Sequence, residues 1–221
     1  MNIQQIRELF ARHADSVKAA GAKAYMRDQF EYFGIQTPVR KSLLKPLWGE
    51  KAEPINWRFV FDCWAQPERE FQYVAMEYLT RKSHQLTADD IPNIRRLVLD
   101  KSWWDSIDAL CNMVGQIVLR DSQVKQIMLD WSMDDNFWIR RMALQHQLLF
   151  RTRTDTQLLS TIICNNFGSK EFFINKSIGW VLREYAKTDP DWVRAFIDDN
   201  REQMSKLSIR EASKHLRKQQ S

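Results

Sequence analysis

The sequence predicts an all-α protein, and three observations support this class. The 221 residues include six glycines and six prolines, and no run of either marks a linker. Apolar residues recur mainly at helical spacing, between short stretches opened by Ser, Thr or Asp. Aromatic residues also recur near the expected helix starts at a nearly constant interval. We therefore expect a single, almost entirely helical domain over residues 1–221.

Thirteen helices are expected along the chain. They cover about residues 2–13, 22–33, 38–48, 55–65, 68–83, 89–100, 103–120, 122–133, 136–150, 155–167, 170–187, 190–200 and 208–219. Two starts have a chemical signature. Thr37 before Pro38 fits an N-cap followed by the first helical position, and "SIRE" (Ser208 to Glu211) matches a capping box.

The recurring aromatic positions indicate an internal repeat. Successive pairs stand 32, 34 and 35 residues apart, namely Phe71-Gln72, Trp103-Trp104, Phe137-Trp138 and Phe172-Phe173. That period is typical of stacked helical hairpins. The sequence therefore predicts a superhelical α-solenoid of irregular HEAT-like helical-hairpin repeats. One helix of each pair would line a concave surface, so side chains at equivalent positions would be neighbours along a basic groove.

Composition excludes several classes of protein. The cysteines, Cys63, Cys111 and Cys164, are far apart and form no C-x-x-C pair, so we expect neither disulfides nor a zinc or other metal site. No stretch has the length of apolar sequence that a membrane span needs, and a cytoplasmic protein is expected. The chain has 33 Lys and Arg and 28 Asp and Glu, which gives a formal charge of +5. Only clustering of these cations on one face would indicate a polyanionic partner.

The expected helix 103–120 carries an acid beside its apolar stripe. Spacings of 4, 3, 4 and 3 define the stripe, which consists of Trp103, Ile107, Leu110, Val114 and Ile117. Trp104 and Asp108 are i and i+4 on a face rotated by roughly 100° from the stripe. The second tryptophan is therefore not required by the core pattern.

Two later helices show a comparable face. In the expected helix 170–187 it holds Lys176, Trp180, Arg183 and Lys187, and in 136–150 it holds Trp138, Arg141 and Gln145. Across three repeats, the predicted groove combines cations, tryptophans and one carboxylate. That combination is suited to an enzyme acting on nucleic acid.

Each of these residues also has a purely structural interpretation. Tryptophans are usually mostly buried, so any of them could serve packing alone. Asp108 could pair with a cation of a neighbouring helix, and Arg141, Lys176 and Arg183 could form a solvated face. Matching positions in three adjacent repeats favour function. Trp64 and Trp103 are assigned to the core, and His146, on an apolar stripe, is expected to be a buried, hydrogen-bonded histidine.

Three stretches resemble the AlkD-like DNA alkylation-repair glycosylases, a family built from HEAT-like repeats. They are "FGIQTPVRKSLLK" (33–45), "KSWWDSID" (101–108) and "SKEFFINKSIGWVLREYAK" (169–187). The resemblance implies excision of cationic N3- and N7-alkylated purines, such as 3-methyladenine and 7-methylguanine, from double-stranded DNA, with the lesion left stacked. We expect no cofactor and no obligate protein partner, and we expect a monomer because a groove enzyme on a continuous strand needs no partner subunit.

Individual residues match the motif of this family. The resemblance implies that Asp108 is the catalytic aspartate and that Trp104 and Trp180 flank the deoxyribose. It further implies that Arg141 is a groove arginine and that Tyr25 belongs to the DNA-binding surface. On position alone, Lys176 and Arg183 join them as expected phosphate contacts.

One carboxylate is sufficient for this chemistry if the departing base is already cationic. Glycoside hydrolysis usually needs a second carboxyl group to protonate the leaving group, but N7-methylguanine leaves as a neutral base. An aspartate with an ordinary pKa of ~4 would be ionised at neutral pH, and nearby cations would keep it so. It would stabilise the oxocarbenium-like sugar, with the two tryptophan faces adding cation–π attraction.

Two other functional classes share part of this pattern. A non-catalytic DNA-binding solenoid would have the basic groove without needing Asp108. A protein-interaction scaffold, the commonest use of helical repeats, would show no salt-dependent affinity for DNA.

Overall fold

The computed structural model describes residues 2–50 and 52–216. In this part of the chain there are thirteen α-helices and no β-strand, so the all-α class is confirmed. No helix among the described residues is long and apolar enough to cross a bilayer. The chain divides into two compact units, Met1–Leu86 and Thr87–Ser221. A single domain over 1–221 stays a prediction.

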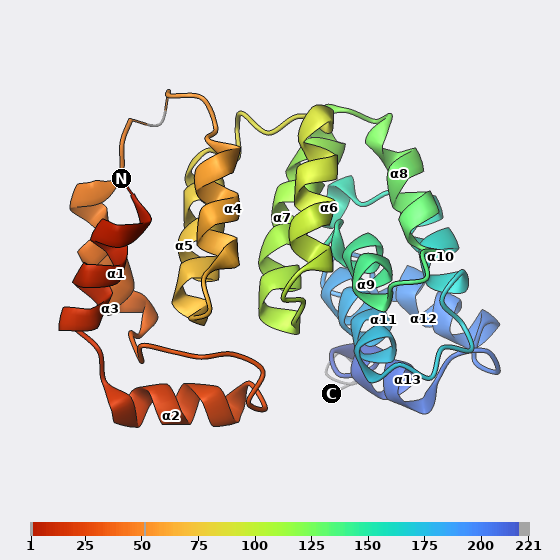
Figure 1. The fold of residues 1–221 in the computed structure, drawn as a ribbon. Coiled ribbons are helices and arrows are strands. Elements are labelled where there is room, and N and C mark those ends of the chain that lie inside the picture. Colours follow the sequence, from red (N-terminus) through yellow and green to blue (C-terminus); the bar gives the residue numbers. More distant parts are fainter. Residues whose placement is uncertain (1, 51, 217–221) are drawn as a thin grey trace. The chain divides into compact units, whose positions relative to one another are not determined.

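The first unit contains five helices. They are α1 (Ile3–Arg12), α2 (Ser16–Tyr25), α3 (Thr37–Leu44), α4 (Trp57–Ala65) and α5 (Arg69–Arg81), with a 3₁₀ turn, η1 (Lys45–Leu47), after α3 (Figure 1). Phe10 of α1 packs against Phe71 of α5, with ring centroids 5.7 Å apart. The buried Glu70 carboxylate accepts backbone N–H bonds from Gly34 at 2.8 Å and Ile35 at 3.1 Å, which fixes the chain leading into α3.

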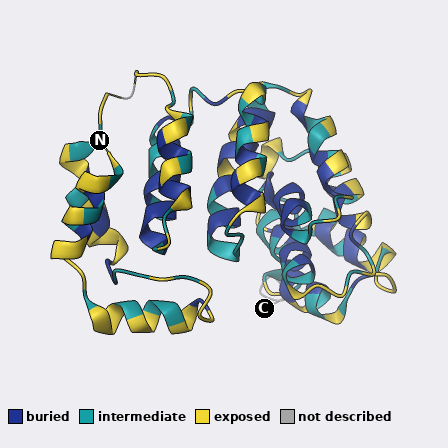
Figure 2. Ribbon diagram, viewed as in Figure 1, coloured by how far each residue is buried: buried dark blue, intermediate teal, exposed yellow. Residues whose placement is uncertain are grey.

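The helix α2 lies elsewhere than the sequence predicted. It begins after Asp15, whose side chain accepts from the backbone of Val17 and Lys18, rather than at residue 22. It ends before Arg27 and Asp28, which adopt left-handed backbone angles of φ 55° and 58°. Figure 2 shows that none of its residues is buried. An apolar pattern could not locate this helix because it packs few apolar side chains.

Two predicted helix caps were also wrong. At α3 the N-cap is Gln36 with no side-chain bond, and Pro38 is the second helical residue rather than the first. At the last helix the cap is Ser205, whose Oγ accepts from Ser208 N at 3.0 Å. Ser208 is instead buried within the helix and donates to the carbonyl of Asn175 at 2.8 Å. A contact with a neighbouring helix has therefore taken the place of the expected capping box.

The second unit contains the remaining helices. They are α6 (Ile91–Leu99), α7 (Trp104–Arg120), α8 (Val124–Trp131), α9 (Phe137–Gln145), α10 (Thr156–Cys164), α11 (Phe172–Tyr185), α12 (Pro190–Asp199) and α13 (Lys206–Ala212), with 3₁₀ turns η2 (Ala88–Asp90) and η3 (Arg151–Arg153). The expected helix to residue 150 ends at Gln145, and Leu149 has φ 74°. Residues 217–219 of the expected last helix lie outside the described residues.

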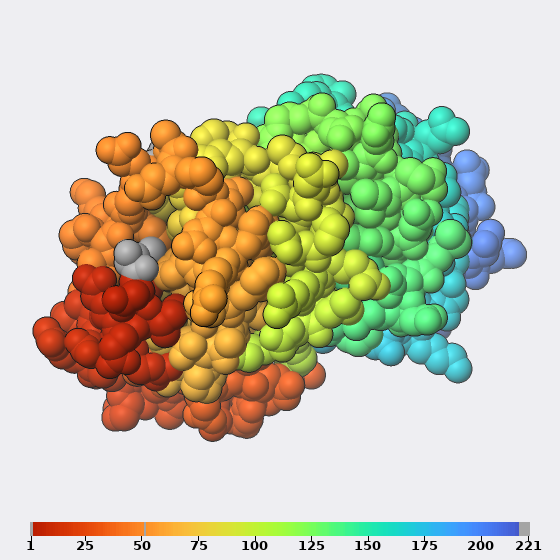
Figure 3. All heavy atoms as spheres, turned by 45° about the horizontal axis from the view of Figure 1, so that its top comes forward, coloured from red at the N-terminus to blue at the C-terminus, as the bar shows by residue number. Residues whose placement is uncertain are grey.

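Helices α7, α9, α11 and α13 of the second unit pack in a row. Helix α7 contacts α9 and α9 contacts α11, in the order of the predicted repeats, and α11 contacts α13. The intervening helices pack on this row, and atoms of α6 and α8 are at the surface in Figure 3. Side chains of α7, α9 and α11 that face a common side are thereby brought together. The superhelix and its concave groove stay predictions.

Candidate functional site

Asp108 lies on α7 beside the predicted apolar stripe. Ile107, Leu110, Val114 and Ile117 are buried, as expected from their spacing. Trp103 is the half-buried N-cap residue of α7, and its ring packs 5.5 Å from that of Phe173. Because Asp108 is rotated away from the stripe, its side chain remains 20% exposed. The carboxylate is therefore at the edge of the core, with access to solvent.

Arg141 of α9 binds this carboxylate. Its Nε and Nη2 donate to Oδ1 of Asp108 at 3.1 and 2.8 Å, and its Nη1 donates to the carbonyl of Phe173 at 2.8 Å. The Arg141 side chain is only 4% exposed, so it is not part of a solvated face. These hydrogen bonds position Asp108. A direct contact between Arg141 and DNA stays a prediction.

Gln145, one turn after Arg141, adds a third donor. With its amide nitrogen facing the carboxylate, Gln145 donates to Asp108 Oδ1 at 2.7 Å, and its oxygen accepts from Arg141 Nη2 at 2.9 Å and Ser177 Oγ at 3.2 Å. Donors from two residues thus converge on Oδ1. No described residue donates a hydrogen bond to Oδ2, which leaves this oxygen available to water or a ligand.

The pKa of Asp108 departs from the expectation of an ordinary value. Burial raises the pKa of Asp108 above its usual range, and this effect outweighs the charge and hydrogen bonds of Arg141 and the bond from Gln145, which lower it. Asp105 raises it further. The expectation failed because the sequence indicates which cations are near the acid but not how much water is removed from it.

The tryptophans of the predicted groove differ in burial. Trp104, the first residue of α7, and Trp180 of α11 are half-buried. Trp138 is buried, with its ring 4.6 Å from that of Phe137 and 4.9 Å from that of Phe173, so its placement in the groove was wrong. Trp138 shares a helix face with Arg141, but Phe173 of the next repeat covers it.

Trp64 and His146 are buried, whereas Tyr25 is exposed. Trp64 is buried in the first unit, as expected. His146 is buried, and its Nδ1 lies 2.6 Å from the carbonyl of Ala143, which confirms the structural interpretation. Burial lowers the pKa of His146 to about 4. Tyr25 is exposed at the end of α2 in the first unit, and its part in DNA binding stays a prediction.

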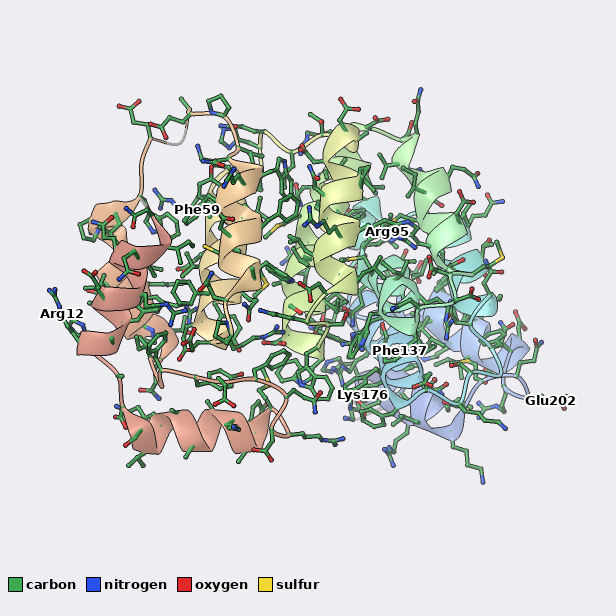
Figure 4. All side chains as sticks on the ribbon, viewed as in Figure 1. Arg12, Phe59, Arg95, Phe137, Lys176 and Glu202 are labelled. Atoms are coloured by element: carbon green, nitrogen blue, oxygen red, sulfur yellow. The ribbon has the colours of Figure 1, made fainter. Side chains whose placement is uncertain are left out.

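The cations of α11 gather around an acid that sequence reasoning missed. Lys176, labelled in Figure 4, is 2.9 Å from Glu211 Oε1, and Arg183 is 2.8 Å from Glu211 Oε2. Burial alone would raise the pKa of Glu211, but hydrogen bonds from Lys214 and Lys176 outweigh it and lower that pKa to about 2. The only sequence signal for Glu211 was the "SIRE" motif, interpreted as a local cap. Lys187 is separate from this group and pairs with Glu184.

Comparisons with known proteins agree on one family. A family model described as "DNA alkylation repair enzyme" matches residues 6–216. A solved structure described as a predicted DNA alkylation repair enzyme from Enterococcus faecalis shares 32% sequence identity, with a TM-score of 0.83. The match covers 92% of this chain and 96% of that one. No curated protein matches the sequence.

Proposed function

The chain belongs to the AlkD-like family of DNA alkylation repair enzymes, and on that premise we propose that it is a DNA glycosylase for cationic N3- and N7-alkylated purines in duplex DNA. The observation that carries this proposal is the Asp108 carboxylate, with donors on Oδ1 and no described donor on Oδ2. Asp108 is the proposed catalytic residue.

The substrate class follows from the presence of one suitable carboxylate. A neutral purine would need an acid to protonate its leaving nitrogen. An N7- or N3-alkylated purine is already positive and departs as a neutral base when it takes the electron pair of the C1′–N bond. The remaining requirement is a negative charge beside C1′ as the sugar becomes cationic, which the ionised Asp108 supplies.

The free oxygen of Asp108 has a second role in this scheme. Arg141 and Gln145 hold Oδ1, so the carboxylate cannot turn freely, and Oδ2 orients the attacking water. The C1′–N bond breaks, a bond forms from the water oxygen to C1′, and the water gives up one proton. The products are an abasic sugar, a neutral alkylpurine and a proton.

Trp104 and Trp180 would complete the site around the sugar. Trp104 stands one helical turn before Asp108 on α7, and an indole face attracts a developing cation by ~0.5–2 kcal/mol. Lys176 and Arg183 of α11, with Tyr25 of the first unit, are the proposed contacts to the DNA strand. Arg141 is assigned to positioning Asp108, because its guanidinium is already bound inside the protein.

Release of free base from duplex DNA containing N7-methylguanine tests this function. Asp108→Asn should lower single-turnover release by about 10²–10³-fold, the effect of removing one preorganised electrostatic group. Asp130→Asn is a matched control, because Asp130 is an exposed acid on α8 and this change should leave release unchanged. A reaction without protein corrects for spontaneous depurination.

Three outcomes separate the functional classes. Release by wild type and not by Asp108→Asn supports the glycosylase. Salt-sensitive binding to DNA without release above background would replace it with a non-catalytic DNA binder. If neither release nor salt-sensitive binding occurred, a protein-interaction scaffold would be the better assignment.

A further inference from the structure

A buried carboxylate on α13 holds three cations. Glu211 has a side chain only 3% exposed, and both its oxygens are occupied. Oε1 is 2.9 Å from Lys176 and 2.8 Å from Lys214, while Oε2 is 2.8 Å from both Arg183 and Lys214. Three positive charges and one negative charge leave a formal charge of +2, so the group is far from neutral.

The three cations of this group are partly exposed to solvent, whereas the Glu211 carboxylate is buried. The side chains of Lys176, Arg183 and Lys214 are 36, 22 and 49% exposed. Among the described residues Arg183 donates to Glu211 through Nη1, which leaves further N–H groups of the guanidinium for another acceptor. Such a surface attracts an anion with several acceptor oxygens.

Backbone contacts set the depth of Glu211. A Cβ atom at Gly179 of α11 would come within 2.4 Å of Glu211 Cβ and 2.8 Å of the Ser208 carbonyl oxygen. Only a residue without a side chain allows this approach of α11 and α13. Gly179 directly precedes Trp180. The contact between Gly179 and α13 therefore also determines where Trp180 lies relative to the three cations.

We propose that Glu211 is a positioning residue that arranges Lys176, Arg183 and Lys214 into a binding site for a backbone phosphate of DNA. The site extends the DNA contacts to Lys214, which follows the end of α13 at Ala212. Its DNA occupant rests on the proposed function, whereas the arrangement of cations rests on the distances above. Holding the long side chains in place before binding reduces the rotamer entropy lost when a phosphate arrives.

The direction in which Glu211→Gln changes the affinity for DNA distinguishes a positioning role from a simple effect of net charge. Glu211→Gln adds one net positive charge, so charge alone predicts tighter DNA binding. Positioning predicts the opposite, because three mutually repelling cations without the negative charge between them would move apart. We expect weaker binding, and the slope of log K against log salt should fall by at least about 0.9, the value for one lost phosphate contact.

A second pair of variants avoids disturbing the buried carboxylate. Lys214→Gln should lower the salt slope by about 0.9. Lys206→Gln removes the same charge from the first residue of α13, and Lys206 is exposed and has no ion pair with a described residue. Its slope should equal that of wild type. Ser208→Ala, which removes the bond from Ser208 to Asn175, controls for loosening of α13 and should leave the slope unchanged.

These titrations use the full chain and an undamaged duplex, so they do not depend on excision. If Glu211→Gln binds as tightly as wild type or tighter, or if Lys214→Gln and Lys206→Gln give equal slopes, the inference is wrong. If the slopes separate as expected while wild type releases no alkylated base, the phosphate site stands and the glycosylase assignment fails.

Discussion

Asp108 and Glu211 are two acids of the second unit that bind cations in different ways. Asp108 shares one oxygen between Arg141 and Gln145 and leaves the other without a described donor. Glu211 has both oxygens bound, by three cations. Burial raises the pKa of Asp108, whereas the cations around Glu211 overcome burial and lower its pKa to about 2.

The two carboxylates therefore differ in electrostatic state within one fold. The buried Arg141 does not fully replace the water removed from around the Asp108 carboxylate. An additional positive charge placed beside this carboxylate would therefore be attracted to it. At Glu211 the three cations stabilise the carboxylate more than the lost water did. The group as a whole therefore has a net positive charge. Under the proposed function, Asp108 stabilises a developing cation and the Glu211 group binds an anion.

The largest expected contrast is in the chemical step. With enzyme in excess and DNA saturated, Asp108→Asn should lower the rate of base release by about 10²–10³-fold, whereas Glu211→Gln should retain the wild-type rate because it acts through binding. Single-turnover release at several protein concentrations measures both. A loss of rate at saturation in Glu211→Gln would show that the two acids are not separable in this way.

A smaller contrast is expected in stability against pH. The pKa of Glu211 is lower in the folded chain, about 2, than its ordinary 4.5, so its stabilisation is present above pH 4.5 and is lost as pH falls toward 2. Glu211→Gln should therefore have a lower Tm than wild type at pH 7, by roughly 2–4 °C for each kcal/mol lost. Thermal unfolding at both ends of this range should show the difference shrinking in acid. A constant difference would argue against ionised Glu211 as its source.

The smallest expected effect is a shift in the pH profile of excision. The bond from Gln145 lowers the pKa of Asp108, so Gln145→Leu should raise that pKa and move the acidic limb of the rate profile to higher pH. Arg141 and Asp105, the charged groups that act on Asp108, are unchanged in this variant. Gln147→Leu is the matched control, because Gln147 is also buried but bonds to Asp155. An identical profile for Gln145→Leu would remove Gln145 from the positioning of Asp108.

The site around Asp108 could be predicted further than the group around Glu211. Helical spacing placed Arg141 and Gln145 on the face that meets Asp108, because residues at i and i+4 share a face in any helix. Helical spacing could not show that Phe173 covers Trp138, because this contact depends on how the next helix packs. It also missed Glu211, whose partners on α11 are brought near by the close approach at Gly179.

The helix α2 illustrates the limit of prediction from apolar patterns. Its position depends on the Asp15 cap and on the left-handed residues that end it, and neither belongs to a periodic pattern. In α7, by contrast, the buried stripe alone was sufficient to place the helix within one residue of its observed start.

The lack of buried side chains in α2 has a kinetic consequence. A ten-residue helix with no buried side chain has little tertiary stabilisation and is marginal in water, so its backbone should open and close without disturbing the rest of the first unit. Amide hydrogens of α2 should then exchange with deuterium well before those of α7, α9 and α11, whose opening requires loss of the core. Protection of α2 on adding a duplex would identify it as a segment stabilised by its ligand.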